Sequence, residues 1–179
     1  MKNKTFTATL LIVSIVVIAG FTAFKLAYTN KRIKNSLPYL TQGEKIKYFD
    51  LISVDDERID SSIFESNRPQ LIFIFSRPCS PCNKNIIYWK KMAEILKDKV
   101  YVYGIILDDV NEAFSFSKNA RLNFNIYAPE NLNEFIKKLR IKLNFSQTIV
   151  YYKNVKFVKL GDMESEEAVN IIKLAKGLV

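Results

Sequence analysis

The sequence predicts an α/β fold, in which helices flank a central mixed β-sheet, preceded by an N-terminal transmembrane helix. In the second half of the chain, short runs of β-branched and aromatic residues alternate with segments of helical spacing. Two strands joined by a tight turn and a final helix end the chain, so the sheet is mixed rather than parallel throughout. Near the start, an uncharged apolar run is long enough to cross a bilayer.

The apolar run Leu71–Phe75 organises the folded part. It is too short for a helix and is typical of a buried strand, which Arg77-Pro78 ends. The motif Cys79-Ser80-Pro81-Cys82 follows at once, and beyond it apolar residues recur at helical spacing over residues 83–97. The two cysteines therefore lie at a strand-to-helix turn, where unpaired helix amides stabilise a thiolate on the first sulfur.

The remaining elements follow from the same patterns. An edge hairpin over residues 45–60 precedes the buried strand. After the motif helix we expect, in chain order, a strand Val100–Leu107, a helix Val110–Asn119, a strand Phe124–Tyr127, a helix Glu130–Lys138, strands Thr148–Tyr152 and Val155–Leu160, and a closing helix. Ser165 is the expected cap of that last helix, and Val169, Ile172 and Leu178 are expected to face inward.

Four segments are predicted: a short basic N-terminus, 1–4, a transmembrane anchor, 5–24, a juxtamembrane stalk, 25–42, and a folded domain, 43–179. Thr5–Phe24 is an uncharged run of 20 residues, which as a helix spans about 30 Å, the thickness of the hydrocarbon core. A cleaved signal peptide has a shorter apolar region, and a buried core helix is not apolar on all sides between lysines. We therefore expect an uncleaved anchor, although basic residues on both sides leave its topology undetermined by charge.

Composition excludes several classes of function. The chain has two cysteines and no histidine, which excludes serine–histidine and cysteine–histidine catalysis and the usual zinc and haem ligands. The net charge is +9, but six basic residues and no acidic ones precede residue 35. The remainder has 21 basic and 18 acidic residues, a net of +3. So small a net positive charge does not indicate a phosphate-binding surface, and nucleic-acid binding is therefore not expected.

The cysteine pair has several interpretations. A zinc site would need two more soft ligands, unless two chains share the metal, and haem attachment would need histidine where Asn83 stands. A structural disulfide would close a four-residue loop and stabilise little. Redox chemistry is the favoured interpretation, with no metal and no cofactor beyond the redox-active disulfide Cys79–Cys82.

From Gly43 to Val179 the sequence resembles the thioredoxin superfamily, most closely its membrane-anchored TlpA/ResA-like thiol-disulfide oxidoreductases. The resemblance is carried by Leu71–Phe75 before the Cys79-Ser80-Pro81-Cys82 motif, an entry hairpin led by Gly43, and the strand Gln147–Val150 before a hairpin and Gly161. It implies a thioredoxin-like fold and thiol-disulfide exchange. Cys79, expected at the exposed end of the turn, would be the nucleophile and Cys82 the resolving thiol.

The neighbours of the pair affect its reactivity. Arg77 and Lys84 would further stabilise the thiolate, or else they are solvated surface charges. Pro81 lacks an amide donor and can tune the potential with a sign that the sequence leaves open.

Three residues depart from the thioredoxin pattern. Phe73 stands where a buried acidic residue is usual, so Asp108 and Asp109 are candidate substitutes as proton acceptor, or else a turn and helix-cap pair. Pro78 replaces the usual tryptophan, which should expose the thiol. Ser146 replaces the cis-proline of the substrate loop, Phe145-Ser146-Gln147. A cis bond before a non-proline residue costs about 2.5–4 kcal/mol, so we expect a trans bond and altered substrate docking.

The resemblance implies a single-pass protein of the cell membrane with its catalytic domain on the extracytoplasmic side. Its partners would be protein thiols and disulfides, a membrane thiol reductase as electron source, and the lipid bilayer through residues 5–24. A reductive role is implied, such as keeping the cysteines of cytochrome c or other exported proteins reduced. The alternative is a catalytically weak binding or assembly module of the same fold. Peroxidase activity is not favoured, because the peroxiredoxin Pro-x-x-x-Thr-x-x-Cys pattern is absent around Cys79.

Overall fold

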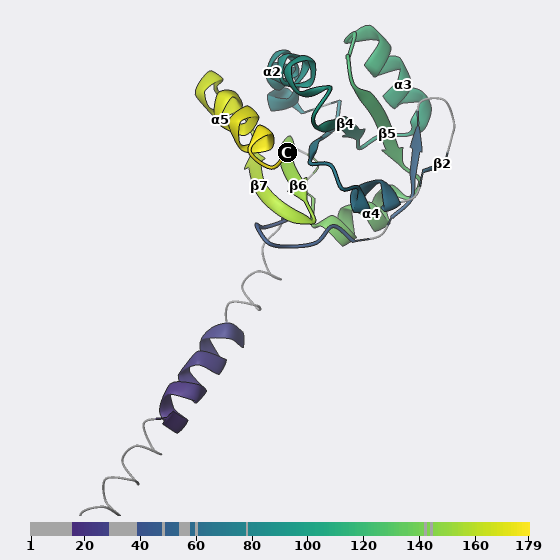
Figure 1. Ribbon diagram of the computed structural model, residues 1–179. Coiled ribbons are helices and arrows are strands. Elements are labelled where there is room, and N and C mark those ends of the chain that lie inside the picture. The colour runs from purple at the N-terminus through teal and green to yellow at the C-terminus, as the bar shows by residue number, and fades with distance from the viewer. Residues whose placement is uncertain are drawn as a thin grey trace, which may run out of the picture. The chain divides into compact units, whose positions relative to one another are not determined.

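The computed structural model describes residues 16–28, 39–47, 49–53, 58–59, 61–77, 79–141, 143 and 145–179. The chain divides into two compact units, Met1–Leu37 and Pro38–Val179. In the first unit, residues 16–28 are helical with exposed side chains (Figure 1, purple). Across the described ranges, no helix combines the length and apolar character needed to traverse a bilayer. Residues 5–15 of the predicted anchor lie outside these ranges.

Seven strands of the described chain form one mixed sheet in the order β2-β1-β5-β4-β3-β6-β7. Their bounds are Leu51–Ser53, Arg58–Ile59, Gln70–Phe75, Tyr101–Ile106, Asn125–Pro129, Gln147–Tyr152 and Asn154–Leu160 for β1 to β7. Strand β3 runs parallel to β4 and antiparallel to β6, and β4 runs parallel to β5. The β1–β2 and β6–β7 pairs are antiparallel, as the sequence predicts.

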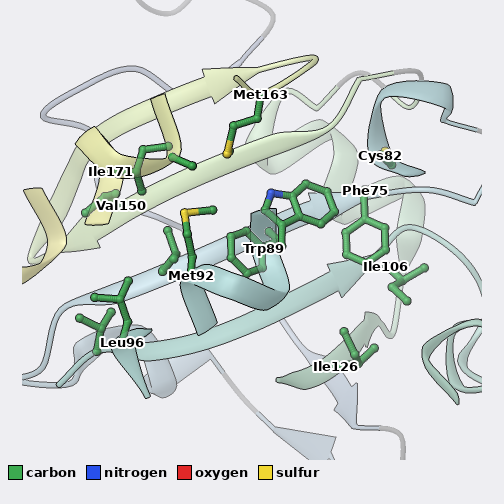
Figure 2. Packing of buried hydrophobic residues seen from close by; sticks show 14 of the residues in the cluster. Phe75, Cys82, Trp89, Met92, Leu96, Ile106, Ile126, Val150, Met163 and Ile171 are labelled. Carbon is green, nitrogen blue, oxygen red and sulfur yellow. The ribbon is translucent and has the colours of Figure 1, made fainter. Parts of the chain in front are cut away.

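Helices cover both faces of the sheet. Their bounds are Ser80–Leu96 for α2, Val110–Asn119 for α3, Leu132–Leu139 for α4 and Ser165–Lys176 for α5, with a 3₁₀ turn, η1, at Ser61–Glu65. Alternate residues of β3 face opposite sides, as strand geometry requires. Leu71, Phe73 and Phe75 join a cluster with α2, α3 and α5, while Ile72 and Ile74 join a second cluster with η1 and α4. Figure 2 shows the first cluster, with Trp89 of α2 near its middle.

The closing helix differs from the sequence prediction by one position. Its N-cap is Glu164 rather than Ser165, and Glu164 and Glu167 form a reciprocal capping box. Helix α5 buries Ala168, Ile171 and Ala175. Val169, expected to face inward, is 46% exposed. The other two residues expected to face inward, Ile172 and Leu178, are partly buried and pack against the first cluster.

The motif helix also begins earlier than expected, because Ser80 and Pro81 belong to its first turn. A proline there loses nothing, since the first amides of a helix have no partner within it. The last three residues of the motif are therefore part of the helix, and Cys79 is its N-cap.

Candidate active site

The structure places the cysteine pair at the strand-to-helix turn that the sequence predicts, with Cys79 between β3 and α2 and Cys82 in the first turn of α2. Cys79 and Cys82 form a disulfide with a Cα–Cα distance of 5.3 Å. Cys79 is the N-cap of α2. Its amide donates to the carbonyl oxygen of Ser76 at 3.2 Å, and the Cys82 amide donates to the carbonyl oxygen of Cys79 at 3.1 Å. Strand, turn and helix are thus hydrogen-bonded together around the sulfurs.

The start of α2 favours negative charge on Cys79. No side chain caps this helix end, and its first turn contains no acidic residue. The positive end of the helix dipole is therefore not neutralised locally. This arrangement stabilises a thiolate on Cys79 once the disulfide is reduced.

The exposure predicted for Cys79 is wrong. Cys79 is 2% exposed and Cys82 1%. Both belong to the apolar cluster that contains Phe75, Trp89 and Met163. Cys79 caps the helix at the point where β3 leaves the sheet, so the residue packs against the core instead of standing out from it. Pro78 and the side chains of Ser80 and Pro81 lie outside the described structure.

The two basic residues near the motif pair with acidic partners. Both oxygens of Asp108 accept from Arg77, from Nε at 2.9 Å and from Nη2 at 3.2 Å, and Glu112 also accepts from this guanidinium. The hydrogen bond to Asp108 raises the pKa of Arg77. Lys84 pairs with Asp162 at 3.2 Å. Arg77 and Lys84 are therefore members of surface ion pairs.

The candidate proton acceptors lie between β4 and α3. Asp108 pairs with Arg77, and Asp109 is the N-cap of α3, where its side chain accepts from the amide of Glu112 at 3.0 Å. These contacts match the alternative interpretation, a turn and helix-cap pair.

Aromatic rings surround Phe73, the residue that stands where the thioredoxin pattern has a buried acidic side chain. Phe73 stacks on Trp89, with ring centroids 5.0 Å apart and planes at 18°. Phe124 and Phe73 form a T-shaped pair, with ring centroids 5.1 Å apart. Trp89 Nε1 donates to the hydroxyl of Thr148 at 2.9 Å. The core beneath the disulfide is thus apolar and neutral where a thioredoxin-like sequence would carry a carboxyl group.

The loop predicted to dock substrate is joined to the cysteine turn through Ser76. The Ser76 hydroxyl donates to the carbonyl oxygen of Leu143 at 2.7 Å. The Phe145–Ser146 peptide bond is trans, as predicted, and no cis bond occurs among the described residues. Ser146 is 1% exposed and Phe145 46%. Gln147 is buried, and its Oε1 has no hydrogen-bond partner.

Sequence reasoning missed Asn85, which is fully buried on α2. It binds Ser146 and Gly161 through Nδ2 and the amide of Met163 through Oδ1. The available signal was its spacing: Cys82, Asn85 and Trp89 recur at three and four residues and share one helix face. A polar residue in that apolar stripe indicates a buried partner.

The sequence matches no protein-family model and no curated protein. Its fold does match solved structures. A proposed thiol:disulfide interchange protein DsbE from Chlorobium tepidum is 15% identical, with a TM-score of 0.65 over 78% of this chain and 99% of that one. The thioredoxin domain of a thiol-disulfide oxidoreductase from Bacteroides vulgatus is 16% identical, with a TM-score of 0.63 over 75% of this chain and 97% of that one. The domain has a thioredoxin-like fold.

The thioredoxin-like fold carries more than one chemistry. The peroxidoxin BcpB from Mycobacterium tuberculosis is 14% identical, with a TM-score of 0.63 over 79% of this chain and 99% of that one. Activity must therefore be argued from the site itself. Within the described residues, no group of three or more histidine, cysteine, aspartate or glutamate side chains could hold a metal ion. Among the described residues, the cysteine pair is the candidate for redox chemistry in this thioredoxin-like domain.

Proposed function

We propose that this protein is a thiol-disulfide oxidoreductase that works through Cys79 and Cys82, without a further cofactor. The observation that carries the proposal is the disulfide between these residues at the uncapped N-terminus of α2 in a thioredoxin-like fold. A helix N-terminus with no competing carboxylate favours the thiolate that exchange requires.

In the reductive direction, the Cys79 thiolate attacks one sulfur of a substrate disulfide. A mixed disulfide forms, and the first substrate sulfur leaves as a thiolate and takes a proton from solvent. The Cys82 thiol then loses its proton to solvent, and its thiolate attacks Cys79 Sγ. The second substrate thiolate leaves and the Cys79–Cys82 disulfide re-forms. The substrate gains two electrons, which a dithiol donor must return to the protein.

Regeneration by that donor requires movement of the turn. An incoming thiolate must reach a disulfide sulfur in line, and Cys79 is 2% exposed in the oxidised protein. The donor would therefore act on an opened form of the turn that carries Cys79.

The setting that we propose is the cell membrane. Residues 5–24 would anchor the chain in the bilayer, with the domain on the extracytoplasmic side and a membrane thiol reductase as electron donor. The apolar run and the TlpA/ResA-like sequence features support this. The substrates would be disulfides of exported proteins, cytochrome c among them. Extraction of membranes with carbonate, which releases unanchored proteins, tests the anchor. Protease added to intact spheroplasts tests on which side of the membrane the domain lies.

A binding or assembly module is the second candidate, favoured by the burial of both cysteines. An insulin-reduction assay with dithiothreitol separates the two, using the full chain in detergent. The oxidoreductase proposal predicts turnover by the wild type and none by Cys79→Ser. An inactive wild type whose Cys79→Ser variant still captures a partner would establish the binding module instead.

A further inference from the structure

A closed ring of hydrogen bonds lies beside the motif helix. Asn85 Nδ2 donates to the Ser146 hydroxyl at 2.9 Å and to the Gly161 carbonyl oxygen at 2.8 Å. The Ser146 hydroxyl donates to the same carbonyl oxygen at 2.8 Å. Asn85 and Ser146 are 0% and 1% exposed. Buried polar groups that are fully paired in this way fix their neighbours in one arrangement.

Two backbone contacts extend the ring. The Gly161 amide donates to the carbonyl oxygen of Ser146 at 2.9 Å, and the Met163 amide donates to Asn85 Oδ1 at 2.8 Å. Gly161 has a φ of +76°, so the turn after β7 relies on glycine. Asn85 thereby joins three segments: the motif helix, the loop before β6 and the turn after β7.

The loop before β6 is held at two points on the side of the cysteines. At one, Ser76 binds the Leu143 carbonyl oxygen, and the carbonyl oxygen of Ser76 also accepts from Cys79. At the other, Asn85 binds Ser146, and Asn85 follows Cys82 by three residues on α2. The side chains of Leu143 and Phe145 remain 45% and 46% exposed. The structure thus presents two apolar side chains from a loop fixed to the cysteine turn.

We propose that Asn85 and Ser146 are positioning residues that together fix the backbone of the loop before β6, in place of the missing proline. With a trans bond at Ser146, the backbone here is not preset by a proline ring, and the polar ring fixes it instead. The loop so fixed selects an extended polypeptide with apolar residues beside its reacting cysteine, in preference to a small thiol compound. This inference rests on the proposed exchange at Cys79 and names the substrate class of the same site.

The test uses the full-length Cys82→Ser variant in detergent, so that Cys79 forms a stable mixed disulfide. Two probes carry the same leaving group, 2-nitro-5-thiobenzoate, bound through a disulfide. One is a ten-residue peptide with leucine and phenylalanine flanking its cysteine, and the other is N-acetylcysteine amide. Each reaction forms a disulfide with Cys79 and releases one coloured thiolate. The ratio of the two rate constants isolates docking from the intrinsic reactivity of the thiol.

Ser146→Thr and Ser146→Val are the matched pair, because both add a methyl group and only threonine keeps the hydroxyl. Ser146→Val and Asn85→Ala should slow the peptide reaction about tenfold, the equivalent of about 1.4 kcal/mol, and leave the small probe within about twofold. Ser146→Thr should restore the peptide rate. Asp162→Asn removes the Lys84–Asp162 pair of the same turn, which is outside the ring, and should change neither rate.

Equal slowing of both probes, or of neither, in variants with an unchanged melting temperature would overturn the positioning role and leave the proposed function standing. If Ser146→Val fails to fold, Ser146→Ala removes the hydroxyl without adding volume and gives the same comparison. If the parent variant reacts with neither probe, exchange at Cys79 fails, and the positioning role fails with it.

Discussion

Trp89 donates a hydrogen bond from its indole Nε1 to the hydroxyl of Thr148, 2.9 Å away, and so joins α2 to β6 within the core. Replacing Thr148 by valine keeps the volume and removes the acceptor. The indole N–H is then buried without a partner, which should lower the free energy of unfolding by about 1–3 kcal/mol. Urea denaturation of the oxidised protein measures this, and Thr148→Ser, which keeps the hydroxyl, is the control. An unchanged midpoint in Thr148→Val would show that the bond contributes nothing.

The core around Gly104 of β4 leaves no room for a side chain at that position. A Cβ there would lie 2.8 Å from Cδ1 of Ile126, 3.0 Å from Cε2 of Phe124 and 3.2 Å from Cε1 of Phe75. Gly104→Ala should therefore destabilise the protein by about 1–3 kcal/mol through overpacking. The double variant Gly104→Ala, Ile126→Val removes the nearest atom and should recover part of the loss. Thermal unfolding of the single and the double variant measures this recovery, and equal melting temperatures would contradict the steric explanation.

Arg77 lies close to Cys79 in sequence, but its charge is shared between Asp108 and Glu112. Because this cluster is partly exposed, its field is screened by solvent and salt. In a Cys82→Ser background, Arg77→Ala should slow alkylation of Cys79 by iodoacetamide by at most about threefold at 0.15 M salt, and by less at higher salt. A tenfold loss that persists in 1 M salt would instead make Arg77 a direct stabiliser of the thiolate.

Glu44 connects the entry segment to the end of α4 through Arg140. Burial raises the pKa of Glu44, but the hydrogen bonds from Arg140 and Thr41 and the charge of Arg140 together outweigh it, so the pKa in the folded protein lies below its ordinary value. A carboxyl group with a lowered folded pKa adds stability above its unfolded pKa and loses it as the pH falls through the folded value. Glu44→Gln should thus be less stable than wild type by about 1 kcal/mol at pH 7. Its deficit should shrink as the pH falls through the lowered pKa of Glu44, as urea denaturation between pH 7 and pH 3 would show.

If that deficit is the same at pH 3 and pH 7, the charge of Glu44 is not its cause. Glu167, whose hydrogen bond with Lys159 lowers its pKa, is a matched surface control on α5. Glu167→Gln should show the same sign of pH dependence, with a smaller amplitude because the group is more exposed.

The parts of the site predicted from sequence are those set by local patterns. A buried strand, a proline and helical spacing place Cys79 and Cys82 at their turn, and the same patterns find α3 at Val110–Asn119 to the residue. The ring around Asn85 was not predictable in this way, because its partners lie 61 and 76 residues away. Whether Cys79 is exposed depends on how α2 packs on the sheet, and whether Ser165 or Glu164 caps α5 depends on side-chain geometry. Such features are tertiary, and periodicity carries no information about them.

The burial of both cysteines has a thermodynamic consequence. Folding and oxidation of this disulfide form one closed cycle, so the order in which they occur cannot change the total free energy. Each 1.4 kcal/mol by which oxidation raises the free energy of unfolding must appear as a shift of about 30 mV, toward more negative values, in the reduction potential of the folded disulfide relative to the unfolded chain. Two melting curves, one oxidised and one reduced, therefore report how readily the folded disulfide accepts electrons from a donor.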